Sequence, residues 1–204
     1  MKRCSAFSLI ELLVVMAIIV ILMAAAVPAL NSVLEGGRLT QATTLIVNQF
    51  TLAKQNATTE NKNITLRVIR KDTSSPYDRI QLVRLDSAGN ATPMLRVATL
   101  PTQTAIASDP SLSSIMGIAE SAADPTKDPS IPGLETSYRY VQFTFRPRGS
   151  LETFRTPDNL GLNIEDNWFA TVVFARHASD SSPPANFATI QIDPVNGGVQ
   201  VYRP

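Results

Sequence analysis

The sequence predicts an α+β protein in which one long N-terminal helix packs on an antiparallel β-sheet head. Two observations lead to this fold class. The residues from Leu12 to Val27 are apolar without a break, and the chain after about residue 60 alternates apolar and polar residues in short runs that end at Pro, Gly, Asn or Asp. With 204 residues, the chain has room for one ordinary domain and an extra element.

The remaining elements follow in order along the chain. An amphipathic helix is expected from about Leu39 to Thr58, with a break or a bend at Gly36-Gly37, because glycine costs about 1 kcal/mol inside a helix. The stretch 101–132 is rich in Ser, Pro and Asp and predicts a surface excursion with a short helix at 112–119. Alternation predicts strands at 64–69, 80–85, 95–100, 138–145, 168–175, 187–192 and 199–202, with a tight turn at 196–198.

Composition excludes several classes of function. Lys and Arg total 18 against 17 Asp and Glu, so the net charge of +1 offers no basic face for a run of phosphates, and we expect no nucleic acid partner. The single cysteine, Cys4, and the single histidine, His177, cannot build a Cys/His zinc site or a Cys–His nucleophile pair. Since no Gly-x-Ser-x-Gly or Walker-type motif occurs, we expect no active site and no cofactor.

The predicted loops of the head offer weak candidates for chemistry. Ca²⁺ needs about six to eight oxygens from a compact run, so aspartates near Pro or Gly are expected to form turns rather than a metal site. These aspartates are Asp124, Asp128, Asp158, Asp166 and Asp193.

Four other features of the head have structural interpretations. His177 is expected to be solvated, and Arg146–Gly149 is expected to form a turn rather than a loop that recognises an anionic partner. Trp168 and Phe169 are expected to pack in the core, because aromatic residues in strands usually do.

The apolar run is long enough for a membrane helix. About 20 helical residues cross a hydrocarbon core, and Lys2 and Arg3 precede the run, so we expect the N-terminus to stay cytoplasmic and the head to be exported. Three interpretations fit this segment: an ordinary secretory signal cut after Ala26, a permanent anchor, or a prepilin-type segment. The first two leave Glu11 unexplained, because a carboxylate in a membrane helix costs a few kcal/mol and normally persists only with a partner.

The third interpretation accounts for Glu11. The residues AFSLIE at 6–11, followed by the apolar run, resemble the cleavage and methylation motif of type IV prepilins and type II secretion pseudopilins. The resemblance implies that a prepilin peptidase cuts between Ala6 and Phe7, that Phe7 is N-methylated, and that the Glu11 carboxylate pairs with the Phe7 amine of a neighbouring subunit during assembly. It also implies a kink at Pro28. The family nearly always has Gly before the cut, whereas this sequence has Ala6.

The head carries a second, more diffuse resemblance. The segments TLAKQNATTENKNITLRV, FTFRPRGS and FATIQIDPVNGGVQVYRP are similar to the H-type minor pseudopilins and related fimbrial minor pilins. Together with IQLVRL, VATLP and the final YRP, they also resemble the Verru_Chthon cassette protein D family, small prepilin-like proteins encoded in sets of four.

These resemblances imply a pilin-like organisation of the chain. Residues 1–6 would be a basic leader, 7–30 a transmembrane and assembly helix, 31–60 an amphipathic stalk helix and 61–204 a β-rich globular head. The implied partners are the prepilin peptidase, other pilin or pseudopilin subunits, an inner-membrane assembly platform and membrane lipid. The implied location is the inner membrane, crossed once with the head in the periplasm, and then a filament or the cell surface.

The sequence therefore predicts a minor pilin or pseudopilin-like structural subunit with no catalytic role. The alternative is a secreted binding or enzymatic domain, released by signal-peptide cleavage after Ala26.

Overall fold

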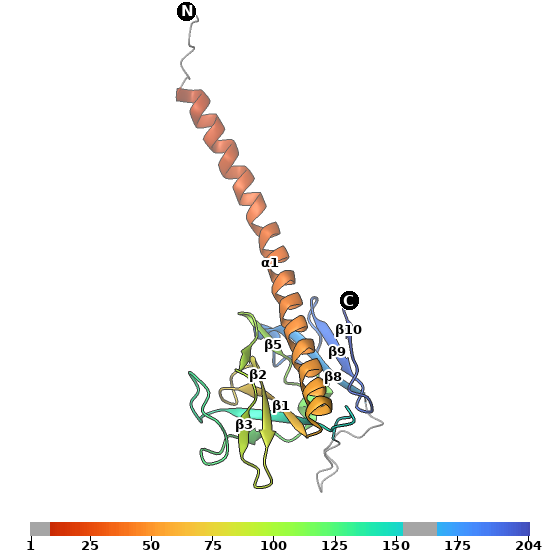
Figure 1. The fold of residues 1–204 in the computed structure, drawn as a ribbon. Coiled ribbons are helices and arrows are strands. Elements are labelled where there is room, and N and C mark those ends of the chain that lie inside the picture. The colour runs from red at the N-terminus through yellow and green to blue at the C-terminus, as the bar shows by residue number, and fades with distance from the viewer. Residues whose placement is uncertain (1–8, 153–166) are drawn as a thin grey trace, which may run out of the picture. The chain divides into compact units, whose positions relative to one another are not determined.

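The computed structural model describes residues 9–152 and 167–204, and only the backbone of residues 25–33. The chain divides into two compact units, of which the first ends at Gly37 and the second extends from Arg38 to Pro204. Helix α1, Leu9–Glu60, begins in the first unit and ends in the second, and all the described strands belong to the second unit (Figure 1).

Helix α1 is continuous where the sequence predicted two helical segments. Pro28, Gly36 and Gly37 all lie inside it, so the expected helix break at the two glycines was wrong. The cost of about 1 kcal/mol per glycine is too small to interrupt a helix that is hydrogen-bonded on both sides. Apart from the chain neighbours and the nearby helix backbone, no described atom lies within 4 Å of the place that a Cβ would take at Gly36 or Gly37, so packing does not require glycine there. The bend at this place stays a prediction.

Among the described residues, no helix combines the length and the apolar character that a membrane crossing demands.

The first sheet has six strands in the order β3-β2-β1-β7-β6, and β4 also pairs with β2. Strand β1 is central and antiparallel to both neighbours, with Leu66 opposite Leu82 of β2 and Phe143 of β7. The predicted pairing of the first two strands is therefore confirmed. The bounds are β1 Ile64–Arg70, β2 Arg79–Leu85, β3 Ala91–Pro93, β4 Ala98–Thr99, β6 Ser121–Ala122 and β7 Arg139–Phe145.

The second sheet has four antiparallel strands in the order β10-β9-β8-β5. The predicted turn between its last two strands is confirmed, since the Asp193 N–H donates to the Gly198 carbonyl at 2.8 Å and the Gly197 N–H donates to the Asp193 carbonyl at 2.7 Å. The bounds are β5 Thr104–Ile106, β8 Trp168–Phe174, β9 Ala188–Ile192 and β10 Val199–Tyr202.

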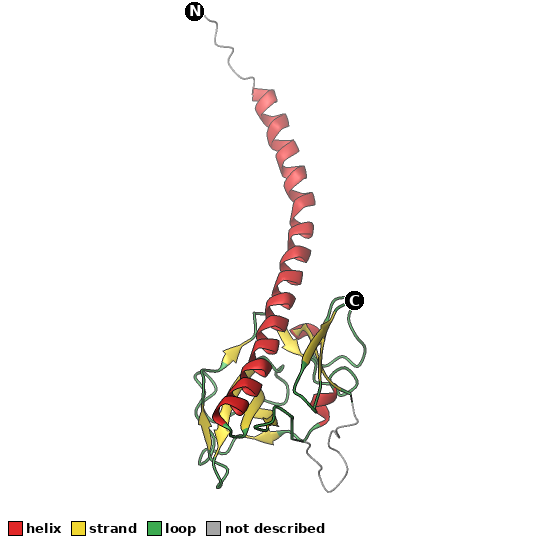
Figure 2. Ribbon diagram, turned by 45° about the vertical axis from the view of Figure 1, so that its right-hand side comes forward, coloured by secondary structure: helices red, strands yellow, loops and turns green. Residues whose placement is uncertain are grey.

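The C-terminal part of α1 supplies one side of the main core (Figure 2). One face of this part of the helix is almost completely buried against strands of both sheets, as the helical spacing predicted; it consists of Leu39, Ala42, Ile46, Phe50, Ala53 and Ala57. The Phe50 ring lies 6.2 Å from that of Phe143 and 6.1 Å from that of Phe145. The α+β fold class, with a helix packed on antiparallel sheet, is confirmed.

A second, smaller core covers the opposite face of the first sheet. Ile69 of β1 and Tyr140 of β7 pack there against Ile131, Leu134 and Tyr138, which belong to the segment before β7. The first sheet is therefore buried on both faces near β1 and β7, and its polar residues on this second face need partners.

Three predictions for the middle of the chain were wrong or only partly right. Of the strand expected at 95–100, only β4 forms, because the irregular segment Met94–Val97 separates it from β3, which ends at Pro93. The stretch 101–132 is not a surface excursion, because it contains β5, and Ala105 and Ile106 are fully buried. The helix expected at 112–119 is a short 3₁₀ helix, η1, Ser114–Gly117. This stretch is rich in Ser, Pro and Asp, and its composition does not indicate that the three residues of β5 pair with β8, which lies far along the chain.

Candidate assembly helix and polar clusters of the head

The N-terminal part of α1 exposes apolar side chains on every side. All its large apolar residues from Leu9 to Met23 have at least 40% of their surface exposed, and Leu9 reaches 82%. A helix that is apolar all round is normally buried in a protein or in a membrane. Within the described chain nothing covers this surface, so it is the first candidate functional site.

The predicted site residues lie at or near this surface. Glu11 is exposed and is the only charged residue of the apolar part of α1. Pro28 lies inside α1. Ala6 and Phe7 lie outside the described residues. The cleavage at Ala6-Phe7, the methylation of Phe7, the pairing of Glu11 and the kink at Pro28 therefore stay predictions.

The first polar cluster of the head is a buried ion pair. The Arg67 Nη1 donates to the Asp128 Oδ1 at 2.7 Å, and only 2% and 3% of these side chains are exposed. The guanidinium lies 4.0 Å above the Tyr140 ring centroid, and the Arg67 Nε donates to the Gln142 Oε1 at 3.3 Å. The Asp124 N–H donates to the second Asp128 oxygen at 2.7 Å.

These contacts offset the desolvation of two buried charges and tie the segment before β7 to the outer face of the first sheet. Burial raises the pKa of the Tyr140 hydroxyl, although Arg67 opposes this shift. The arrangement is structural. Asp128 forms a buried ion pair in addition to the turn that the sequence predicted.

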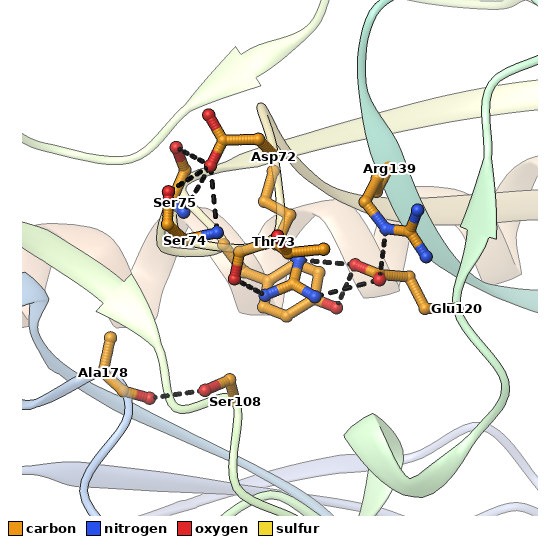
Figure 3. Close-up of polar contacts among 10 residues, drawn as sticks. Asp72, Thr73, Ser74, Ser75, Ser108, Glu120, Arg139 and Ala178 are labelled. Carbon is orange, nitrogen blue, oxygen red and sulfur yellow. Dashed lines mark hydrogen bonds and ion pairs between the residues drawn. The ribbon is translucent and has the colours of Figure 1, made fainter.

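The second polar cluster is centred on the Glu120 carboxylate, which meets two guanidinium groups and a phenol. The Arg139 Nε lies 2.5 Å from Oε2 (Figure 3). The Arg70 Nε lies 2.5 Å from Oε1. The Tyr77 hydroxyl donates to Oε1 at 2.7 Å. Burial alone raises the pKa of Glu120, but the hydrogen bonds from Arg70, Arg139 and Tyr77 outweigh it and lower that pKa to about 2. The pKa of Tyr77 is raised, chiefly by burial and by its bond to Glu120.

This cluster joins three parts of the head. Glu120 precedes β6, Arg70 ends β1, and Arg139 begins β7. The carboxylate stays ionised and fully hydrogen-bonded near neutral pH, so it holds chain segments together and is poorly suited to accept a proton from a substrate.

The aspartates predicted to form turns do so where they are described. Asp124 accepts hydrogen bonds from the Thr126 N–H at 2.9 Å and from the Thr126 hydroxyl at 2.7 Å, and Asp193 accepts from the Val195 N–H at 2.8 Å. Asp158 and Asp166 lie outside the described residues. In the part of the chain that the structure describes, no group of three or more His, Cys, Asp or Glu side chains could hold a metal ion.

The sequence also made predictions for two aromatic residues, one turn and one histidine of the head. Trp168 is 1% exposed and belongs to the core, as predicted, whereas Phe169 is half-buried. Residues 146–149 form the predicted turn, in which the Gly149 N–H donates to the Arg146 carbonyl at 2.8 Å. The side chain of His177 is 34% exposed and lies 2.8 Å from the Asp180 carboxylate.

The N-terminal segment matches a known family model. Residues 1–27 match the family model described as the prokaryotic N-terminal methylation motif. The chain carries a prokaryotic N-terminal methylation motif. This match confirms the prepilin-type resemblance of the leader and of the apolar run after it. The narrower resemblance to the cassette protein D family stays a prediction.

The whole chain was also compared with curated proteins and with solved structures. No curated protein matches the chain. Among solved structures, the minor pseudopilin EpsH of the type 2 secretion system of Vibrio cholerae aligns with a TM-score of 0.42 and 9% identity, over 80% of this chain and 98% of that one. The type IV minor pilin FimU of Pseudomonas aeruginosa aligns with a TM-score of 0.46 and 11% identity, over 82% of this chain and 93% of that one.

Proposed function

We propose that this chain is a minor pilin or pseudopilin subunit that joins a filament through the N-terminal part of α1. The observation that supports this proposal most directly is the coincidence of the methylation motif at residues 1–27 with an apolar helix surface that nothing in the described chain covers. A soluble enzyme or binding domain has no use for such a surface. The role is structural, since assembly requires packing and pairing but no catalytic side chain.

The proposed pathway starts in the membrane. Residues 1–6 are the leader, and residues 7–30 cross the inner membrane once, with Lys2 and Arg3 on the cytoplasmic side and the head in the periplasm. A prepilin peptidase removes the leader, and an inner-membrane platform then transfers the subunit from lipid to the growing filament or to its surface-exposed end. Membrane lipid and the other subunits successively cover the same apolar side chains.

Glu11 gives this transfer its register. In a bundle of apolar helices the carboxylate is stable only next to a positive charge, and cleavage before Phe7 creates a new N-terminal amine. If the Glu11 carboxylate of one subunit pairs with the Phe7 amine of the next, each charge offsets the desolvation of the other. The apolar surface alone would permit many alignments, whereas this pairing favours one.

Mass spectrometry of the mature N-terminus tests the proposal against its alternative. Protein purified from membranes should begin with N-methylated Phe7, because the proposed cut falls between Ala6 and Phe7. A mature chain that begins at Val27 would identify a secreted domain released by signal-peptide cleavage. Helix α1 continues through Ala26 and Val27, so such a cut would fall inside a helix.

A further inference from the structure

A pocket of about 770 Å³ opens at one edge of the first sheet. It is lined by Gln81 of β2, by the irregular segment Met94–Val97 and by Ile131 and Pro132 of the segment before β7. Most of the lining is apolar, which is typical of a surface that binds a partner. The two clusters centred on Asp128 and Glu120 are not part of it.

The pocket exists because the chain leaves the sheet between β3 and β4. Strand β3 pairs with β2 up to Pro93 opposite Val83, and β4 resumes the pairing with Ala98 opposite Ile80. The edge chain advances five positions between these pairs while β2 advances three, so the segment Met94–Val97 bulges out by two residues. The Met94 N–H still donates to the Leu82 carbonyl at 3.0 Å.

The bulge leaves main-chain groups available. The N–H and C=O groups of Leu95, Arg96 and Val97 form no hydrogen bond with any residue that the structure describes. Gln81 is 3% exposed, yet its Oε1 has no hydrogen-bond partner in the described parts of the chain. A buried acceptor without a donor is unfavourable, so a ligand that brings an N–H group would relieve it.

The charged residues of the pocket are all positive. Arg79 and Arg96 line it, and no lining residue is acidic. Arg96 is exposed and makes no ion pair or hydrogen bond with a described residue, and the Arg79 Nε lies 4.0 Å from the Asp78 carboxylate. Leu95, beside Arg96, is 44% exposed. An apolar cavity with unpaired guanidinium at its rim complements an apolar side chain next to a carboxylate.

We propose that this pocket binds an extended peptide segment of a partner protein, in which an apolar side chain lies beside a carboxylate. The apolar side chain enters the cavity, the carboxylate pairs with Arg96, and main-chain groups of the peptide bond those of Leu95–Val97. A fatty acid would also bring a carboxylate and an apolar chain, but it has no N–H group for Gln81 or for the carbonyls of the bulge. The inference does not depend on the proposed role of α1 in a filament.

A defined probe tests the proposal on the full-length protein in detergent. The probe is a fluorescently labelled pentapeptide with a leucine between two aspartates, and fluorescence anisotropy measures its binding. Arg96→Gln should weaken binding about two- to fivefold, the range for an exposed ion pair. Leu95→Asp should weaken it more, because it puts a like charge beside the aspartates and removes an apolar contact.

Matched variants control for charge and for folding. Arg148→Gln removes an exposed arginine of the turn at 146–149 that has no ion pair with a described residue, and Val195→Asp places a carboxylate at a residue that is 61% exposed in another turn. Both should bind the probe as the parent protein does. An unchanged Trp168 fluorescence spectrum would show that each variant remains folded.

Three outcomes would overturn the proposal. The first is that the probe does not bind, and the second is that Arg148→Gln weakens binding as much as Arg96→Gln, which would indicate attraction by net charge alone. The third is that dodecanoate displaces the probe at a lower concentration than the unlabelled peptide does, which would assign the pocket to lipid. None of these results depends on whether Phe7 is methylated.

Discussion

Substitution of Gly197 by alanine should destabilise the head at the place where two turns meet. Gly197 has a φ of +65°, and a Cβ built on it would lie 2.3 Å from the Gly149 carbonyl oxygen. It would also lie 3.3 Å from side-chain atoms of Lys54 and Phe145. The contact with Gly149 involves backbone on both sides, so no rotation of a side chain can relieve it.

The magnitude follows from two separate effects. An alanine in the left-handed region costs about 1–2 kcal/mol, and overpacking of a close contact adds about 1–3 kcal/mol. Gly89 provides a matched control, since its φ is +82° and, apart from its chain neighbours, no described atom lies within 4 Å of the corresponding Cβ position. Gly89→Ala should therefore lower the free energy of unfolding by about 1–2 kcal/mol, and Gly197→Ala by about 2–5 kcal/mol.

Tryptophan fluorescence provides the assay. The chain has one tryptophan, Trp168, which is 1% exposed and pairs with Ile192 directly before the turn that contains Gly197. Urea unfolding of the full-length protein in detergent, followed at this residue, should give a lower midpoint for Gly197→Ala than for Gly89→Ala. Equal midpoints for the two variants would refute the clash with Gly149 and leave only the backbone effect.

Three further predictions concern the leader, the assembly helix and the Glu120 cluster. Glu11→Ala should reduce sedimentable filament and increase membrane-bound monomer without unfolding the head, because the proposed pairing acts between subunits; an unchanged filament yield would contradict the pairing. Ala6→Gly should speed the conversion of precursor to mature protein on a gel and Ala6→Leu should slow it, because a side chain before the cut obstructs the peptidase; equal rates would contradict cleavage at this place. Glu120→Gln should lower the free energy of unfolding by about 1–3 kcal/mol at neutral pH. The pKa of Glu120 in the folded protein is about 2, below the ordinary value of 4.5. The difference in free energy of unfolding between the parent protein and Glu120→Gln should therefore be full above pH 4.5 and shrink as the pH falls towards 2. A difference that is independent of pH would argue against the two ion pairs.

Periodicity predicted the parts of the fold that local patterns determine. The buried face from Leu39 to Ala57 recurs at helical spacing, and strands β1, β2, β7, β8, β9 and β10 each alternate or are aromatic and β-branched. In these elements the pattern along the chain predicted the secondary structure, although β1 is buried on both faces and β10 is largely exposed. The continuity of α1 through Gly36-Gly37 was missed, because intrinsic propensity is a weak constraint within a long helix.

Long-range pairing accounts for most of the other errors. Strand β5 has three residues and lies in a stretch that looks like a loop, yet it closes one edge of the second sheet by pairing with β8. Its backbone hydrogen bonds, and the burial of Ala105 and Ile106, depend on residues about 70 positions away. No local rule for strands could assign it.

The polar clusters were missed for a related reason. Arg67 occupies the polar position of an alternating strand, which normally predicts a solvated side chain. It is buried because the segment that contains Ile131 and Leu134 covers this face of the sheet and brings Asp128 to the guanidinium. The sequence contained one usable sign, a charged residue in the middle of a strongly apolar segment, but it could not name the partner.

The proposed assembly through α1 has two energetic parts, one from the apolar side chains and one from the Glu11 carboxylate. Each large apolar side chain between Leu9 and Met23 would gain about 1.5–3 kcal/mol on full burial, so together they favour burial by roughly 20 kcal/mol or more. This term holds the helix in any apolar surroundings, but it hardly distinguishes lipid from other helices or one alignment from another, because apolar contact is non-directional. An unpaired Glu11 would be unfavourable by a few kcal/mol in every alignment except the one that meets a cation. In the proposed filament, the apolar residues would therefore set the strength of the association, and Glu11 would set its geometry.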